Sequence, residues 1–169
     1  ARSYKAWSWM VVPPLHVGFA FRFDNLTAVM CLVVTGIGSL IHLYAIGYMA
    51  EDESRPRFFC YLNLFLFSML LLVLGRNLLV MFVGWEGVGL CSYLLIGFWN
   101  KEMGNTIAGQ KAFVLNRIGD AGFLLGMFLL FQETRTIDFM ALQLNMGFLS
   151  PGAVELAALL LFVGAVGKS

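Results

Sequence analysis

Charged side chains are scarce in this chain. Only 12% of its 169 residues are Asp, Glu, Lys or Arg and 60% are hydrophobic, whereas soluble domains carry about 25% charged residues. The composition therefore excludes an ordinary water-soluble domain. The net charge of +1 provides no basic surface that could hold a phosphate backbone, so we expect no nucleic-acid partner.

Cysteine and histidine are also few. Cys31, Cys60 and Cys91 lie roughly thirty residues apart within apolar runs, a spacing that favours neither a zinc site nor a disulfide framework. His16 and His42 are far apart as well. We therefore expect no metal site, haem, iron–sulfur cluster or other cofactor in this chain.

Nucleotide-binding motifs are missing too. Residues 84–89 read GWEGVG, which is rich in glycine but has neither the GxGxxG nor the Walker A spacing. The segment also lies inside an apolar run rather than after a strand. Since no arrangement typical of an enzyme active site appears elsewhere, the chemistry that the chain offers is the binding and release of protons.

Long apolar runs dominate the sequence instead. A membrane span needs about 20 mostly apolar residues to cross about 30 Å of hydrocarbon. Five stretches meet or begin to meet this requirement: residues 26–49, 58–75, 78–99, 112–131 and 153–169, of which we expect the last to be incomplete. Each is apolar on all sides, which is typical of a membrane helix. We predict an all-α fold, a polytopic transmembrane helix bundle over residues 26–169.

The first 25 residues differ from the rest and are predicted to lie outside the membrane. Large apolar side chains alternate there with other residues, as in a strand with one buried face. The alternating residues are Trp7, Trp9 and Val11 before Pro13-Pro14, and Phe19, Phe21 and Phe23 after it. We expect a hairpin at the membrane surface.

Two connecting segments have recognisable patterns. Arg76 and Asn77 divide an apolar run of about forty residues, which is too long for one crossing, so we predict a tight turn between two helices. A short amphipathic helix in the membrane interface is predicted further along. Its apolar face would consist of Ile137, Met140, Ala141 and Leu144, at i, i+3, i+4 and i+7.

Glu86 is the first of the ionisable residues that fall inside apolar runs. It is the ninth residue of its run, about 12 Å along the helix axis, and so near the middle of a membrane. A charge there costs about 2.5–3.5 kcal/mol on insertion scales, and this helix supplies no cation within one turn. Gly84, Gly87 and Gly89 would let another helix approach and supply a partner. We interpret Glu86 as a titratable carboxylate in a proton path; the alternative is a structural carboxyl bound to a hydroxyl or to the backbone.

Arg117 and Asp120 are three residues apart and so share one helix face. They either neutralise each other as a self-contained ion pair or form a polar link in a proton relay. Lys168 would lie deep in the last run if that helix continued. Lysine suits proton transfer because burial readily lowers its pKa, whereas arginine stays charged.

His42 lies late in the first apolar run, between Leu40-Ile41 and Leu43-Tyr44. A histidine inside a membrane can carry protons near neutral pH. A structural histidine that is hydrogen-bonded to a Ser or Thr of the next helix fits the sequence equally well.

Five segments are distinctive enough to compare with known families. They read HLYAIGYM at 42–49, FVGWEGVGLCSYLLIGFW at 82–99, KAF at 111–113, NRIGD at 116–120 and GAVGKS at 164–169. Together, and in order, they resemble the antiporter-like membrane subunits of respiratory complex I, the NADH:quinone oxidoreductase. The resemblance covers nearly everything from Phe21 onward.

The resemblance implies a fold of two inverted five-helix repeats, with a glutamate on the fifth membrane helix and a key lysine on the seventh. The five runs would then be the third to the start of the seventh helix, and the chain would be a fragment. By the same resemblance, Glu86 and Lys168 would form a charge pair whose separation moves a proton. Asp120 and Arg117 would tune or connect that pair, and the hairpin would face away from the cytoplasm.

The resemblance also implies proton translocation coupled to quinone reduction, with FMN, iron–sulfur clusters and quinone in other subunits. The expected partners are membrane lipid and other complex I membrane-arm subunits, especially a neighbouring antiporter-like subunit. The expected location is the bacterial inner membrane or, alternatively, the mitochondrial inner membrane. A Na⁺/H⁺ antiporter of the Mrp type, a membrane-bound hydrogenase subunit and a non-pumping structural fragment remain alternatives.

Overall fold

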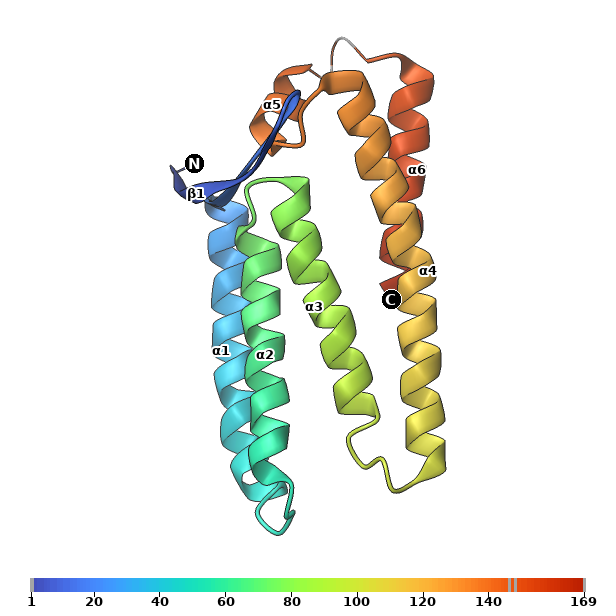
Figure 1. Cartoon of the computed structure of the whole chain (residues 1–169). Helices are drawn as coiled ribbons and strands as arrows, with labels where there is room; N and C mark the ends of the chain where they lie inside the picture. The colour runs from blue at the N-terminus through green and yellow to red at the C-terminus, as the bar shows by residue number, and fades with distance from the viewer. Residues whose placement is uncertain (1, 146, 148, 169) are drawn as a thin grey trace.

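The chain folds into a bundle of long helices with a hairpin at one end (Figure 1). The computed structural model describes residues 2–145, 147 and 149–168. Five helices, α1–α4 and α6, are long and apolar enough to cross a membrane, which confirms the predicted transmembrane bundle. The elements in order are β1 (Arg2–Val12), β2 (Leu15–Phe23), α1 (Asn25–Tyr48), α2 (Arg55–Leu74), α3 (Leu78–Ile96), α4 (Met103–Thr134), α5 (Phe139–Asn145) and α6 (Pro151–Lys168).

Side-chain caps fix where two of these helices begin. The Asp24 carboxylate accepts a hydrogen bond from the Thr27 backbone N–H at 2.9 Å, and the Thr27 hydroxyl oxygen accepts one from the Asp24 N–H at 2.7 Å. This reciprocal pair satisfies N–H groups that have no partner within the helix. At the start of α3, the Asn77 side chain accepts from the Val80 N–H at 2.9 Å. Asn77 thus ends the tight turn predicted between the second and third membrane helices.

Helix α4 is longer than its apolar run. It begins at Met103 rather than at residue 112, and its 32 residues extend over about 48 Å, more than about 30 Å of hydrocarbon. Hydropathy detects only the apolar part of this helix. The polar residues between Met103 and Lys111 still form a helix because their backbone hydrogen bonds do not require apolar side chains.

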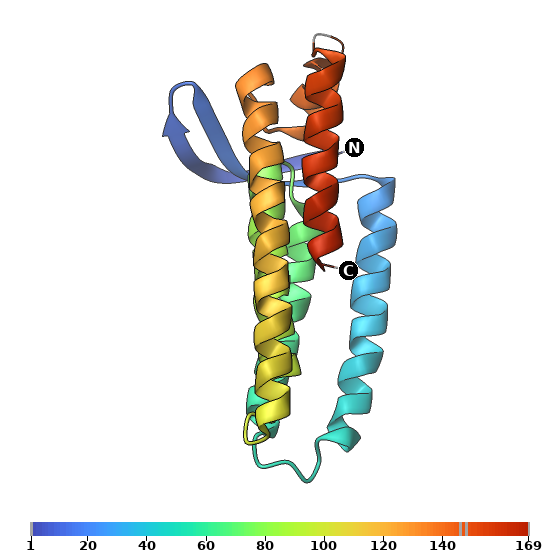
Figure 2. The same cartoon turned by 90° about the vertical axis from the view of Figure 1, so that its right-hand side faces the viewer.

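The membrane helices pack in a row, and α6 then returns along α4. Helices α1 and α2 lie side by side, α3 lies next to α2, and α4 packs against both α3 and α6. The view turned by 90° shows α6 beside the half of α4 that is nearer to the hairpin end (Figure 2). The C-terminal end of α6 therefore lies about midway along the bundle.

Small residues bring α4 and α6 close together. A Cβ atom added to Gly119 would lie 2.8 Å from the Gly167 Cα, and one added to Gly164 would lie 2.9 Å from the Phe123 Cβ. Neither position can hold a larger side chain without movement of a helix. Such close approach is how small residues support packing between membrane helices, and it brings the end of α6 against the middle of α4.

The hairpin is present as predicted, with β1 and β2 paired antiparallel. The Trp7 and Phe19 rings stack across it with centroids 4.5 Å apart. The predicted short helix is also present as α5. Leu144 of the predicted apolar stripe is 78% exposed, whereas Leu142, outside the stripe, is only 6% exposed, so a second apolar side of this helix packs against the protein.

The reason is that α5 packs into a core formed by other elements. Leu142 and Ile137 belong to a buried cluster that also contains Val17 of the hairpin, Leu78 of α3 and Leu130 of α4. In a helix of seven residues, these contacts determine which side is buried, and the periodicity of the sequence is too short to do so.

Candidate functional site

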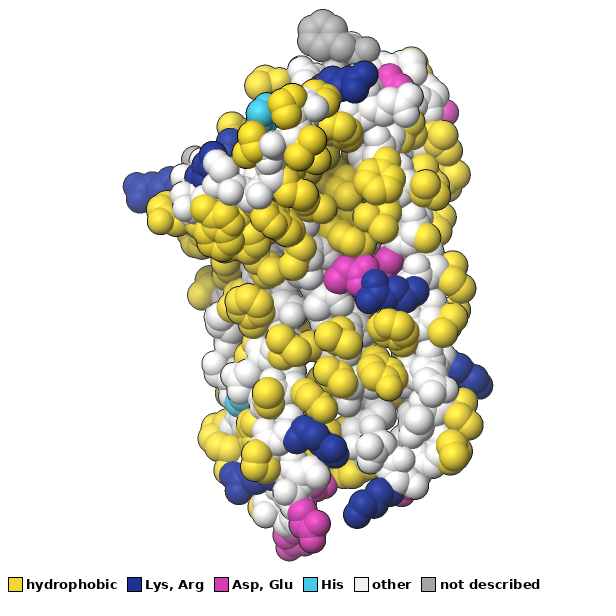
Figure 3. All heavy atoms as spheres, viewed as in Figure 1, with side chains coloured by type: hydrophobic (Ala, Val, Ile, Leu, Met, Phe, Trp, Pro, Cys, Tyr) yellow, Lys and Arg dark blue, Asp and Glu magenta, His cyan; other side chains and the backbone are white. Residues whose placement is uncertain are grey.

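Glu86 and Arg117 form an ion pair between two membrane helices. Glu86 is on α3, about 12 Å from its first residue, and its carboxylate binds the Arg117 guanidinium of α4. Their side chains are 23% and 48% exposed. Figure 3 shows acidic and basic side chains in contact midway along the molecule, with hydrophobic side chains above and below them. The cation that α3 itself lacks therefore comes from the neighbouring helix.

The partner of Arg117 corrects one prediction. The self-contained pair of Arg117 with Asp120 does not form, although the two residues share a helix face. Asp120 is only 3% exposed, and its carboxylate accepts a hydrogen bond from the Trp85 indole N–H at 2.7 Å. The long Arg117 side chain extends to Glu86 instead and passes 4.9 Å from the Phe113 ring centroid.

Lys168 completes the cluster from the end of α6. Its ammonium nitrogen donates a hydrogen bond to the Trp85 backbone oxygen at 2.7 Å and lies 5.3 Å from the Trp85 ring centroid. A Cβ atom added to Gly89 would lie 2.8 Å from the Lys168 Nζ. Glycine at this position therefore gives the ammonium group the space to reach α3.

Glu86 and Lys168, the charge pair implied by the family resemblance, are not in direct contact. In the part of the chain that the structure describes, the Glu86 carboxylate pairs with Arg117, and Lys168 bonds to a backbone carbonyl rather than to Glu86. The reason is geometric, because Trp85 presents its carbonyl to α6 while Glu86 faces Arg117. The two residues thus make separate contacts within one cluster, and their role as a charge pair stays a prediction.

Trp85 is the residue of the cluster that the sequence did not reveal. Its side chain binds Asp120 and its backbone carbonyl binds Lys168, so it connects an acid of α4 with a base of α6. A packing aromatic was the simplest interpretation of a tryptophan in an apolar run. The available signal was its indole N–H, which usually needs a hydrogen-bond partner when it is buried.

His42 is not part of the cluster. It lies on α1, which packs against α2. Its Nδ1 is 2.8 Å from the Gly38 backbone oxygen, so the alternative of a bond to a Ser or Thr of the next helix is wrong. Its Nε2 is buried and has no hydrogen-bond partner among residues 2–145, 147 and 149–168.

The cluster contains two acids and two bases whose formal charges cancel. Glu86 comes from α3, Arg117 and Asp120 from α4, and Lys168 from α6. A polar group inside a membrane is costly unless it is paired, and these contacts provide the pairing. The arrangement defines the class of protein: a polytopic membrane protein with ionisable groups inside its helix bundle.

Comparisons with known proteins specify this class further. Residues 75–169, more than half of the chain, match the family described as NADH:quinone oxidoreductase/Mrp antiporter, TM. Residues 9–59 match the family described as NADH-Ubiquinone oxidoreductase (complex I), chain 5 N-terminus. The chain therefore belongs to the NADH:quinone oxidoreductase/Mrp antiporter transmembrane family.

Relatives from bacteria and a fungus align with almost the whole chain. NADH-quinone oxidoreductase subunit L of Mycobacterium tuberculosis is 47% identical over 165 residues, which are 98% of this chain and 26% of the relative. Subunit L of Escherichia coli is 47% identical over 99% of this chain and 28% of its own length. NADH-ubiquinone oxidoreductase chain 5 of Allomyces macrogynus is 46% identical over 95% and 25%. The chain thus spans about a quarter of the length of these relatives.

A solved structure has the same fold. A chain of the Mrp complex from Dietzia sp. DQ12-45-1b superimposes with a TM-score of 0.83 and 26% sequence identity. The match covers 99% of this chain and 18% of that chain. With the five apolar helices and the family match, this likeness identifies the chain as part of an integral membrane protein.

Proposed function

We propose that this chain is part of a proton-translocating membrane subunit of an NADH:quinone oxidoreductase. The observation that carries the proposal is the cluster of four ionisable groups from three adjacent helices, halfway along the bundle. The identity of 47% with proteins named subunit L supports this choice within the family. Proton transfer through a membrane requires such paired, titratable groups.

Glu86 and Asp120 serve as proton-binding groups in this proposal, and Arg117 and Lys168 control their charge. Two unit charges about 4 Å apart, as in a direct ion pair, interact by about 4 kcal/mol at an effective dielectric constant of about 20. Movement of Arg117 away from Glu86 removes attraction of this size from the carboxylate. Glu86 then binds a proton more readily and releases it when the guanidinium returns.

His42 is the least supported member of the path. It is on a different helix pair from the other four groups. Its Nδ1 is engaged with its own helix at 2.8 Å. We propose that His42 only carries protons sideways, between the other four groups and the α1 side of the bundle. Its Nε2, which has no hydrogen-bond partner among the described residues, offers a lone pair for this.

The redox chemistry is proposed to occur elsewhere in the complex. This chain offers no group of three or more His, Cys, Asp or Glu side chains that could hold a metal ion within the residues that the structure describes. We propose that FMN, iron–sulfur clusters and quinone belong to other subunits. The proposed partners are other membrane-arm subunits, especially a neighbouring antiporter-like subunit, in a bacterial or mitochondrial inner membrane.

The direct test replaces Glu86 with glutamine in the complete subunit and measures NADH-driven acidification of inverted membrane vesicles. We expect the pumping rate to fall by about tenfold or more, as on loss of a group that transfers protons. Glu155→Gln is the matched control, because Glu155 is exposed near the start of α6, and it should leave pumping unchanged. Normal pumping by Glu86→Gln vesicles would exclude the assigned role.

A Mrp-type Na⁺/H⁺ antiporter subunit is the second candidate. It is favoured by the likeness to the Dietzia Mrp complex at a TM-score of 0.83. The two functions differ in what drives proton movement. Sodium-dependent proton exchange by the complete protein without NADH would favour the antiporter, whereas acidification that requires NADH and is blocked by a quinone-site inhibitor would favour the oxidoreductase.

A further inference from the structure

A polar pocket lies at the hairpin end of the bundle, away from the charge cluster. It has a volume of about 160 Å³ and is lined by Lys5, His16, Gly18, Arg76, Asn77 and Asp138, together with two apolar residues. This is close to the size of a cavity of about 150 Å³ that holds a benzene-sized molecule. The pocket is therefore large enough for a small polar group.

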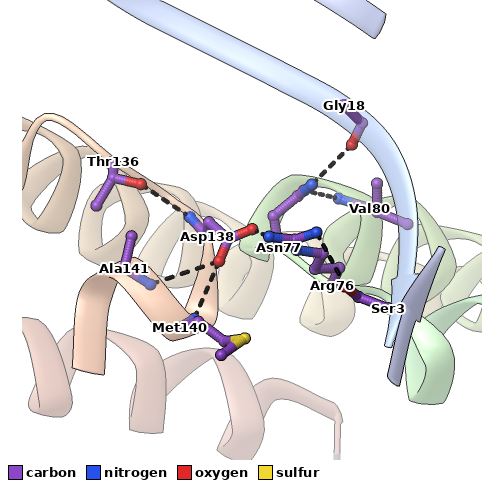
Figure 4. A network of polar contacts seen from close by, with 9 residues as sticks. All are labelled: Ser3, Gly18, Arg76, Asn77, Val80, Thr136, Asp138, Met140 and Ala141. Carbon is purple, nitrogen blue, oxygen red and sulfur yellow. Dashed lines mark hydrogen bonds and ion pairs between the residues drawn. The ribbon is translucent and has the colours of Figure 1, made fainter. Parts of the chain in front are cut away.

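Three segments that are far apart in the sequence build this pocket (Figure 4). The Arg76 guanidinium donates to the Asp138 carboxylate at 2.8 Å and to the Ser3 hydroxyl at 3.3 Å. The Asn77 amide donates to the Gly18 carbonyl at 2.8 Å. The hairpin, the α2–α3 turn and the α4–α5 connection are thereby held together, so the lining residues have fixed positions.

The charges around the pocket favour an anion. Lys5 and Arg76 are cations, and Asp138 is the single acid among the lining residues. Both oxygens of Asp138 are already engaged: Oδ2 accepts from Arg76, and Oδ1 accepts from the Met140 and Ala141 N–H groups. Asp138 therefore orients Arg76 and leaves Lys5 as uncompensated positive charge.

Lys5 reaches the pocket because Gly18 has no side chain. A Cβ atom added to Gly18 would lie 3.2 Å from the Lys5 Cε, so the lysine chain lies across β2 at this position. Asn77, whose amide donates to the Gly18 carbonyl, is the N-cap of α3. The positive end of that helix dipole adds to the attraction for a negative group.

The pocket also lies where two candidate membrane spans end. Its Arg76 and Asn77, together with Gly75, connect the last residue of α2 with the first residue of α3, and both helices are long and apolar enough to cross a membrane. Trp7 and Trp9 of the adjacent hairpin are exposed, and tryptophan is enriched at this level of membrane proteins.

We propose that this pocket binds the phosphate group of an anionic phospholipid. The lysine ammonium and the guanidinium would contact the phosphate oxygens, and the acyl chains would lie along the apolar surface of the bundle. The proposal does not depend on proton translocation, since it concerns a different end of the molecule and is measured by lipid binding.

The test uses the complete protein in nanodiscs of phosphatidylcholine that contain a small fraction of spin-labelled phosphatidylglycerol. Electron paramagnetic resonance reports the immobilised fraction of the labelled lipid. We expect Lys5→Gln to weaken phosphatidylglycerol binding by about fivefold, the effect of one cation near a membrane surface. Arg2→Gln is the matched control: it removes the same charge from the same strand, but Arg2 is outside the pocket lining, so binding should hardly change.

Three outcomes would overturn the proposal. The first is an equal loss in Lys5→Gln and Arg2→Gln, which indicates attraction to the whole surface. The second is equal immobilisation of spin-labelled phosphatidylcholine and phosphatidylglycerol. The third is displacement of the labelled lipid by millimolar inorganic phosphate, which assigns the pocket to a soluble anion. Unchanged circular dichroism of both variants ensures that a loss of binding reflects the site and not the fold.

Discussion

Polar side chains have different hydrogen-bond partners on the two sides of the helix bundle. On α1 and α2, these groups donate to a carbonyl oxygen of their own helix, one turn earlier. Examples are Thr35 to Cys31, Ser39 to Thr35 and Asn63 to Phe59. On α3 and α4, Ser92 and Thr134 also bond to their own helix, but other polar contacts of α3, α4 and α6 connect helices. These are the contacts of Trp85 with Asp120 and Lys168, and of Glu86 with Arg117.

This difference shows where the fold is constrained. A helix that satisfies its polar groups on its own backbone can shift or rotate without leaving a donor unpaired. In the other half, each such movement breaks a contact between charged groups in a medium of low polarity, where the loss is large. We therefore expect substitutions on the α3–α4–α6 side to have the greater effects on stability.

The largest effect should come from the glycine contact between α4 and α6. In Gly119→Leu, the new side chain would collide with the Gly167 Cα and the Gly164 carbonyl, at 2.8 and 3.1 Å from the new Cβ. We expect the free energy of unfolding to fall by about 3 kcal/mol, measured by titration with SDS in mixed micelles.

Gly36→Leu on α1 is the control for this substitution. No atom lies within 4 Å of a Cβ at Gly36 among the residues that the structure places, so the change should stay below about 0.5 kcal/mol. Equal destabilisation by the two substitutions would contradict the proposed difference between the two sides.

A smaller loss of stability is expected from removing a hydrogen bond between a tryptophan and an aspartate. The molecule has two such hydrogen bonds among its described residues, and they provide a matched pair. The Trp85 indole donates to the buried Asp120 at 2.7 Å, and the Trp99 indole donates to the exposed Asp52 at 2.8 Å. Trp85→Phe should lower the free energy of unfolding by about 2 kcal/mol, because a buried acid loses its donor. Trp99→Phe should lower it much less, since water can replace the indole at this exposed hydrogen bond. Similar losses would mean that burial of Asp120 is energetically unimportant.

Double-mutant cycles can test which acid, Glu86 or Asp120, pairs with Arg117. Glu86→Gln and Arg117→Gln should show a coupling free energy of about 1 kcal/mol, because the residues form a direct ion pair. The cycle of Asp120→Asn with Arg117→Gln should give a clearly smaller coupling. A larger coupling free energy for Asp120 with Arg117 than for Glu86 with Arg117 would instead support an ion pair within α4, as the sequence spacing suggested.

The smallest effect is expected from the protonation of Asp52, which lies in a loop at the end of the bundle opposite the hairpin. The hydrogen bond from the Trp99 indole, with help from the Ser54 N–H, lowers the pKa of Asp52 below its usual value of 3.8. A lowered pKa in the folded state means that this stabilisation is present above the pKa of the unfolded chain and is lost as the pH falls through that of the folded state. The nuclear magnetic resonance signal of the Trp99 indole proton should therefore shift with a midpoint below pH 3.8.

Asp52→Asn is the control, and it should abolish this transition. A midpoint above 3.8 would show that the hydrogen bond does not stabilise the carboxylate.

The sequence predicted the elements well because each depends on local physics. Five apolar runs are sufficient to indicate membrane helices, and the alternation around Trp7 and Phe19 is sufficient to indicate a hairpin. Arg76 and Asn77 identified the turn, since polar residues in an apolar run of that length favour an exit from the membrane. The acids and bases of the candidate site were found for the same reason: a charge inside a span is conspicuous.

What the sequence could not provide was the pairing between helices. A helix that is apolar on all sides has no preferred face, so its periodicity does not indicate its rotation about its axis. Arg117 and Asp120 looked like partners because they are close in the chain. Only the packed helices show that Glu86 binds Arg117 and that Trp85 lies between Asp120 and Lys168.

The sequence by itself therefore determined that this is a membrane protein, which segments cross the bilayer and which ionisable residues lie inside it. These properties follow from the free energy of transfer of each side chain, which is a local quantity. The tertiary structure decided which charges meet, which face of α5 is buried and where the polar pocket at the hairpin end is assembled. These properties depend on contacts between segments distant in sequence, and they were fixed by the glycine packing of α4 on α6 and by the hairpin docked on the α2–α3 turn.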